Sequence, residues 1–229
     1  MCLNSSWARG AVAPGELISI FGSNFGPAGL RTSAAQNSSI PMVLGNTRAF
    51  FDGRAGAITA ATANQINVFV PYEVTAPVVN MVVDVDGVPS GALRVPVSNS
   101  ALGLSSAVGS GTGQGAVLNQ DGSYNSRANP ARRGTVISVF GTGEGAIAPP
   151  LPDGALVISS PLSTPVVSPI GVTIAGQKAD VLYAGSAPSL PAGVFQLNVR
   201  IPLGATPGDA PISASAGSSV APGQVTVAI

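Results

Sequence analysis

The stretch Gly15-Glu16-Leu17-Ile18-Ser19-Ile20-Phe21-Gly22-Ser23 decides the fold of this chain, because it occurs twice. Residues 134–142 repeat it almost letter for letter as Gly-Thr-Val-Ile-Ser-Val-Phe-Gly-Thr. A second pair follows the two copies in the same order, Gln-Ile-Asn-Val-Phe-Val-Pro at 65–71 and Gln-Leu-Asn-Val-Arg-Ile-Pro at 196–202. Two ordered matches indicate an internal duplication, with one structural unit in each half.

The composition favours short strands over helices. The 229 residues include 29 glycines and 20 prolines, and both residue types break helices. A chain of this length forms one large domain or two of roughly 100–120 residues. Aromatic residues make up only 5%, so we expect a core of Val, Ile, Leu and Ala.

The chain carries very little charge. Only 9% of its residues are Asp, Glu, Lys or Arg, against about 25% in typical globular domains. Lys178 is the single lysine, so the clustered cations that bind phosphates are lacking and nucleic acid is disfavoured as a partner. Two interpretations stay open: a secreted protein with a Ser, Thr, Gly and Asn surface, or a chain that lives in an assembly, since near-zero net charge promotes association.

Cys2 is the only cysteine, which excludes an internal disulfide and leaves its own role open. No apolar run reaches the roughly 18 residues of a membrane span. Met1 to Gly10 show no secretory signal. The expectation is therefore either an intracellular protein or a sequence that begins after a removed leader.

The first half reads as a series of short strands. They are expected at 16–21, 42–44, 47–51, 55–60, 64–70, 79–85 and 92–97. Within the strand at 64–70, Ile66, Val68 and Val70 face inward and the residues between them, Phe69 included, face outward. Asp52-Gly53 marks a hairpin turn, and residues 27–40 read as a long loop. This pattern is typical of an immunoglobulin-like sandwich.

The second half repeats the pattern with variations. Residues 98–113 are expected to hold the junction, a hairpin with its turn at 120–123 opens the second unit, and a Pro-rich loop spans 146–169. Further strands are expected at 134–140, 171–175, 178–183, 194–201, 210–216 and 223–228. The sequence thus predicts an all-β fold of two tandem immunoglobulin-like β-sandwiches. Their predicted bounds are 1–100, with an extended lead-in at 1–14, and 101–229, with an extra N-terminal hairpin.

The motifs also carry a family resemblance. The first half is similar to IPT/TIG immunoglobulin-like domains in the turn Gly-Ser-Asn-Phe-Gly at 22–26, in Phe51-Asp52-Gly53-x-Ala55, in 65–71 and in Asp-Gly-Val-Pro-Ser at 86–90. The whole chain resembles the uncharacterised C-terminal domain of large secreted acidobacterial (Solibacter-type) proteins in Ala-Pro-Gly-Glu at 13–16, in 113–123, and in Asn-Pro-Ala at 129–131 with Gly134 following. The resemblance implies tandem sandwiches and an extracellular or cell-surface location, which favours a removed leader. It implies no activity.

No constellation of catalytic residues is visible. The sequence contains no histidine, so Ser-His-Asp and Cys-His catalysis are excluded. A Ser-Lys dyad would need Lys178, which reads as a solvated turn lysine. Paired carboxylates could hydrolyse glycosides, but most aspartates fall in turns, where Asp favours the local backbone geometry. These are Asp52, Asp86, Asp121, Asp153 and Asp209. No catalytic, cofactor-binding or metal residue is assigned, and no cofactor is expected.

Two groups of oxygens imitate cation sites. Asn119-x-Asp121-x-Ser123-x-Asn125 alternates like a calcium loop, but position twelve is Pro130 instead of the bidentate Glu. Asp84 and Asp86 share a strand face and could bind a cation between chains. Hairpin chemistry explains both groups. The glycine runs at 109–113 and 141–145 are not phosphate cradles, because no helix pattern follows either.

Modification and sugar stacking stay open. Asn4 and Asn37 fit the N-glycosylation acceptor pattern. Four aromatic residues, Trp7, Tyr72, Tyr124 and Tyr183, could stack on sugars, although packing in the core or between domains is the favoured explanation.

The function favoured by these observations is a non-enzymatic extracellular module: a surface protein or fibre subunit. Its expected partners are further copies or other surface proteins, joined by strand addition through residues 1–14. The alternative is a carbohydrate-binding or spacer module of a secreted protein, which would show two or three exposed aromatic rings on one face. An enzyme is opposed by the missing histidine and the turn placement of the carboxylates.

Overall fold

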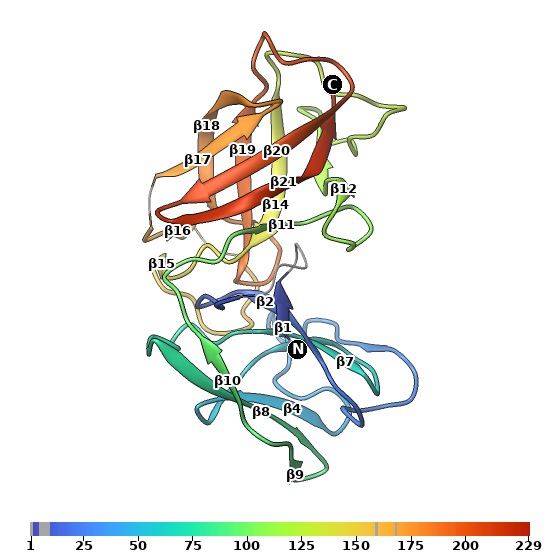
Figure 1. Ribbon diagram of the computed structural model, residues 1–229, viewed down its shortest axis with the longest axis vertical. Coiled ribbons are helices and arrows are strands. Elements are labelled where there is room, and N and C mark those ends of the chain that lie inside the picture. The colour runs from blue at the N-terminus through green and yellow to red at the C-terminus, as the bar shows by residue number, and fades with distance from the viewer. Residues whose placement is uncertain (1, 5–9, 159, 168) are drawn as a thin grey trace.

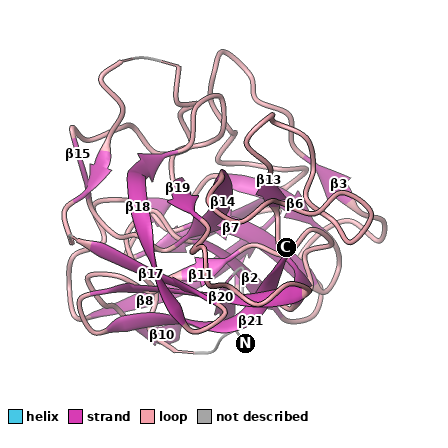
Figure 2. Ribbon diagram, turned by 90° about the horizontal axis from the view of Figure 1, so that it is seen from above, coloured by secondary structure: helices cyan, strands magenta, loops and turns pink. Residues whose placement is uncertain are grey.

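The chain is all-β, built from two immunoglobulin-like β-sandwiches in tandem. A computed structural model describes residues 2–4, 10–158, 160–167 and 169–229, and side chains except those of residues 2–4 and 222–223. Within these ranges every regular element is a strand. The two sandwiches stack along the long axis of the molecule, with the C-terminus at the far end of the second sandwich (Figure 1). Figure 2 looks down this axis and shows only strands and loops.

The first sandwich consists of two separate sheets. One sheet has the order β1 (Cys2–Asn4), β2 (Leu17–Phe21), β7 (Gln65–Phe69), β6 (Ile58–Ala61) and β3 (Arg31–Thr32). The other has the order β10 (Leu93–Pro96), β8 (Val78–Val85), β4 (Thr47–Phe51) and β5 (Arg54–Ala55), with β9 (Val88–Pro89) paired to β8. All these pairs are antiparallel.

The second sandwich closes into one continuous sheet, because a single long strand pairs on both layers. Its order is β11 (Gly103–Leu104), β14 (Val136–Thr142), β19 (Val194–Arg200), β18 (Gln177–Ser186), β17 (Ile170–Ile174), β20 (Asp209–Ala216), β21 (Ser219–Ala228) and β12 (Gly113–Gln114). β13 (Val117–Leu118) also pairs with β14, and β15 (Ile147–Ala148) with β16 (Thr164–Pro165). β18 pairs with β17 through residues 177–179 and with β19 through residues 180–186.

Each sandwich has its own apolar core. One cluster of buried side chains runs from Val12 to Val95, and another runs from Leu102 to Val227. Val, Ile, Leu and Ala dominate both clusters, with Phe51 and Phe195 as the largest fully buried side chains. The predicted boundary at 100–101 falls between the two clusters and, as a division into domains, stays a prediction.

The repeated motifs form the same strand pair in both halves. Ile18 pairs with Val68 across β2 and β7, and the matching residues pair across β14 and β19. On the outer face of the first pair, the Ser19 hydroxyl and the Gln65 amide both donate to Asn67 Oδ1, at 2.9 and 2.8 Å. Ser138, Gln196 and Asn198 repeat this arrangement at 3.0 and 2.8 Å. The shared Ser and Gln-x-Asn positions therefore hold the outer face of the two strands together.

The N-terminal strand has a counterpart in the second half. β1 places Leu3 opposite Ser19, and β13 places Leu118 opposite Ser138, the residue that matches Ser19 in the repeat. Cys-Leu-Asn at 2–4 thus lies in the same register as Val-Leu-Asn at 117–119. In this structure the lead-in completes the sheet of its own chain.

Some predicted elements were wrong in detail. Residues 42–44 form no strand, and 55–60 divides into β5 and β6 around a bend. The loop at 27–40 contains β3, whose backbone covers the edge of β6. Phe69 does not face solvent: it is 3% exposed, because the second sandwich covers that end of β7.

The hairpin turn Asp52-Gly53 has positive φ at both central residues, 47° and 84°, as a type I′ turn requires. We expect Gly53→Ala to destabilise the chain by about 1 kcal/mol, because a Cβ strains this backbone region even where space is open. Gly91→Ala is the matched control, since it also meets open space but lies outside the positive-φ region. Urea denaturation of both variants checks this, and equal midpoints would contradict it.

Candidate functional site

The most elaborate region of the molecule is the junction between the two sandwiches. Residues 153–157 run between them, beginning in a turn at Asp153 and Gly154. On the side of the first sandwich, the Ile40 amide donates to Gly154 O and the Leu156 amide donates to Ser38 O, both at 2.8 Å. On the side of the second sandwich, the Ala192 amide donates to Ala155 O at 2.7 Å. One backbone segment therefore joins both halves.

A buried threonine ties the repeated strands to each other. Thr142, at the end of β14, is 1% exposed. Its hydroxyl accepts from the Leu17 amide at 2.7 Å and donates to Gly193 O at 2.8 Å. Two backbone groups from opposite sandwiches thus meet on one side chain.

Apolar packing and close backbone approach complete the junction. Ile40, Ala57 and Phe69 form a buried cluster that also includes Val194 of the second sandwich. Gly193 lies so close to the first sandwich that a Cβ there would sit 2.0 Å from Gly15 O. Only a glycine permits this approach.

A group of polar side chains is enclosed at the same junction. Glu144, in the loop between β14 and β15, is 2% exposed. Its two carboxyl oxygens, the Tyr72 hydroxyl and the Ser186 hydroxyl are buried without a hydrogen-bond partner among the described residues. Buried polar groups normally have partners, so each exception calls for an explanation.

Burial shifts the acidity of these groups. Desolvation raises the pKa of Glu144 to about 8, since burial disfavours the charged form. Burial is also the main cause that raises the pKa of the Tyr72 hydroxyl, with the charges of Glu144 and Asp153 adding to it. Partial burial raises the pKa of Asp153 as well. The Oδ1 atom of Asp153 accepts a hydrogen bond from the Tyr72 amide at 2.9 Å.

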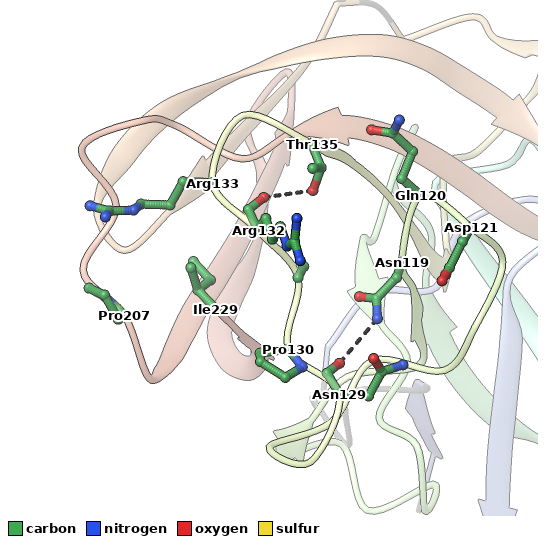
Figure 3. Close-up of a pocket in the computed structure, with 11 residues that line it drawn as sticks. Asn119, Gln120, Asp121, Asn129, Pro130, Arg132, Arg133, Thr135, Pro207 and Ile229 are labelled. Carbon is green, nitrogen blue, oxygen red and sulfur yellow. Dashed lines mark hydrogen bonds between the residues drawn. The ribbon is translucent and has the colours of Figure 1, made fainter.

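A surface groove lies at the opposite end of the second sandwich (Figure 3). It encloses about 900 Å³ and is open to solvent. Polar side chains dominate it, including Asn119, Gln120, Asp121 and Arg132. Figure 3 shows the Thr135 hydroxyl donating to Arg132 O, at 2.6 Å, and Asn119 Nδ2 donating to Asn129 O, at 3.1 Å.

The residues that imitate a calcium loop hydrogen-bond to one another. Asp121 Oδ1 accepts from the Ser123 amide at 3.0 Å and from the Ser123 hydroxyl at 2.6 Å, and these bonds lower the pKa of Asp121. Asn125 Nδ2 donates to Asn119 Oδ1 at 2.9 Å. The structure brings the four residues together as a hydrogen-bonded turn.

The other residues singled out in the sequence lie apart. Lys178 is exposed on β18. Asp84 pairs with Arg48 at 3.8 Å and accepts from the Gly87 amide. Asn37 is exposed in a loop, where its glycosylation stays a prediction. Trp7 and the side chains of Cys2 and Asn4 lie outside the described residues.

The three tyrosine candidates differ in exposure. Tyr124 is 82% exposed, whereas the Tyr72 hydroxyl is buried in the junction and Tyr183 is half-buried. Within the described residues, no group of three or more His, Cys, Asp or Glu side chains could hold a metal ion. In the same part of the chain, no helix is long and apolar enough to cross a membrane.

Sequence reasoning missed the two central residues of the junction, Thr142 and Glu144. Both lie in the run Gly141-Thr142-Gly143-Glu144-Gly145, whose sequence pattern indicates only that it is not a phosphate cradle. One signal was available: a lone acidic residue among glycines, in a chain that is only 9% charged.

We expect Thr142→Val to destabilise the chain by roughly 1–3 kcal/mol, because it leaves a buried amide and a buried carbonyl without their shared partner. Thr142→Ser keeps the hydroxyl and serves as the control. Denaturant unfolding measures both variants. A Val variant as stable as the Ser variant would show that the hydroxyl does not hold the junction.

No protein-family model matches the chain, and no curated protein matches it. Among solved structures it is similar to the plexin A4 extracellular region, domains 1 to 8, with 11% identity, 100% of this chain and 17% of that chain covered, and a TM-score of 0.32. It is also similar to SGBP-B of the Bacteroides ovatus mixed-linkage glucan utilization locus, in complex with a mixed-linkage heptasaccharide. The identity is 16%, the match covers 95% of this chain and 42% of that chain, and the TM-score is 0.34. A third match is SGBP-B from a complex xyloglucan utilization locus in Bacteroides uniformis. The identity is 13%, the match covers 98% of this chain and 48% of that chain, and the TM-score is 0.29. The chain spans less than half the length of each of these chains.

Proposed function

We propose that the chain is a non-enzymatic extracellular structural module, a stiff pair of sandwiches whose copies join through the N-terminal strand. The observation that carries the proposal is the junction. Backbone hydrogen bonds from residues 153–157 reach both sandwiches, and Thr142 adds two more. Two sandwiches held in this way transmit force as one body.

The chemistry of the chain supports a structural role. The sequence has no histidine. Glu144, a carboxyl whose pKa is raised to about 8, is enclosed in the junction and has no access to substrate. In the groove of Figure 3, Asn119 and Asp121 hydrogen-bond within their own loop.

An extracellular location is supported by the low charge and by the family resemblance to secreted proteins. A surface of Ser, Thr, Asn and Gly does not rely on charge for solubility, and near-zero net charge favours association between copies.

Assembly through β1 is supported by its place in the sheet. β1 is an edge strand, held by antiparallel pairing of residues 2–4 with residues 18–20 of β2. The same backbone groups of β2 would accept this strand from a neighbouring copy. Exchange of a terminal element between copies is a low-cost route to dimers and fibres.

Light scattering and small-angle X-ray scattering test the proposal on three proteins: the full chain, a chain that starts at Gly10, and the Gly193→Ala variant. We expect the full chain to form dimers or longer assemblies, and a chain that starts at Gly10 to stay monomeric with or without an added peptide of residues 1–9, because a free peptide fills the edge of β2 without linking two copies. Gly193→Ala should assemble like the parent chain but sample a wider range of angles between the sandwiches, because its Cβ cannot fit against Gly15 O. A full chain that stays monomeric at all concentrations would refute the assembly, and a Gly193→Ala variant as stiff as the parent would refute the role of the junction.

A carbohydrate-binding module is the second candidate, and the polar groove of Figure 3 is the observation that favours it. Its Asn, Gln, Asp and Arg side chains are groups that hydrogen-bond to sugar hydroxyls. Next to it, Asn129 Nδ2 donates to the backbone of the exposed Tyr124, the single tyrosine available for stacking among the described residues.

A glycan array with the full chain tests this alternative. If the groove binds sugars, Tyr124→Ala should weaken binding by about tenfold, since aromatic contacts contribute about 1 kcal/mol or more. Leu30→Ala, a change at an equally exposed site in the first sandwich, should bind like the parent. An array without any bound glycan removes the candidate.

A further inference from the structure

Glu144 occupies a position where its repeat counterpart is apolar. Aligning Gly15 with Gly134 places Glu144 opposite Phe25. Phe25 packs its ring over Gly22 and against the core of the first sandwich. Packing alone therefore does not require a carboxyl here, and an apolar side chain closes the other copy of the same sheet end.

Among the described residues, no cation acts on Glu144, since burial is the one cause that raises its pKa. The charge of Glu144 acts on the hydroxyls of Tyr72, from the first sandwich, and Tyr183, from the second. Asp153 acts on Tyr72 from the segment that joins the sandwiches. None of these three groups carries a positive charge that would offset a negative charge at Glu144.

We propose that the Glu144 carboxyl is a proton-dependent latch of the junction: while it carries a proton the two sandwiches stay docked, and when it ionises they separate. An ionised carboxylate cannot stay buried without partners. Opening the junction would return it to water at the cost of the interdomain hydrogen bonds and of the small apolar cluster around Phe69. Unfolding a sandwich would cost a whole core, and each sandwich has its own.

The direction of the pH effect follows from the raised pKa. The pKa of a Glu144 carboxyl exposed to water is 4.5, and in the docked state burial raises it to about 8. Between these values the docked state binds one more proton than the open or unfolded state. The stabilisation of the docked state by the protonated carboxyl is thus fully present below pH 4.5. Between pH 4.5 and about 8 the docking equilibrium constant falls by about tenfold for each pH unit. The stabilisation is lost once the pH has risen through about 8.

This inference is independent of the proposed function, and its test needs only the monomeric chain that starts at Gly10 beside the full chain. Small-angle X-ray scattering at about pH 6 and about pH 9.5 compares the parent, Glu144→Gln and the exposed-site control Asp180→Asn. We expect the parent and Asp180→Asn to widen their range of sandwich orientations at the higher pH, and Glu144→Gln to give the same curve at both. Widening in Glu144→Gln, or none in the parent, overturns the proposal.

A direct titration keeps the idea testable if Glu144→Gln does not fold. Carbon-13 NMR of the parent, labelled at glutamate carboxyls, follows each Glu through the pH range. We expect one resonance with a midpoint near pH 8 and a simultaneous change in the amide shifts of Leu17, Ile40 and Leu156. If every glutamate titrates below about pH 6, or the amide shifts stay constant through the transition, the latch does not exist.

Discussion

The structure depends on one backbone segment, residues 153–157, that makes hydrogen bonds to both sandwiches. Amide and carbonyl groups that are removed from water must pair, and here they pair with residues of both halves. Gly193 approaches Gly15 closely at the same junction, where a Cβ at Gly193 would sit 2.0 Å from Gly15 O. Phe69 is buried there as well, since the second sandwich covers the end of β7.

The two copies are alike where a sheet pairs within itself and different where one copy meets the other. The outer-face triad of Ser19, Gln65 and Asn67 recurs with the same hydrogen bonds in the second half. At the junction the first copy presents Phe69 and Tyr72. Their counterparts at the free end of the second copy are Arg200 and Leu203, both exposed. The two halves therefore share the internal contacts of a sandwich, and their ends differ according to what covers them.

The difference between contacts within a sandwich and contacts between the sandwiches explains which features could be predicted from the sequence. Strand pairing leaves a local pattern, so the alternation at 196–201 and the turn at Asp52-Gly53 predicted the fold correctly. The junction leaves no such pattern, because its residues come from loops far apart in the chain. Phe69 illustrates this limit. The alternation places its side chain on the outer face of β7, and that face is buried only because the second sandwich covers it. Glu144 was missed for the same reason, since a glycine-rich loop gives no sign of what will cover it.

The position of Glu144 in the junction determines which part of the molecule opens when this carboxyl ionises. Two self-sufficient cores leave the contact between them as the part that opens at the lowest cost. A carboxyl without partners in either core would lower the stability of the whole sandwich at neutral pH. The same carboxyl in the junction acts only on the docking of the two bodies, because separating them is enough to hydrate it. Stiffness and sensitivity to protons therefore arise from the same contact surface: the junction that makes the pair rigid is also the one place where a buried charge can be relieved without unfolding.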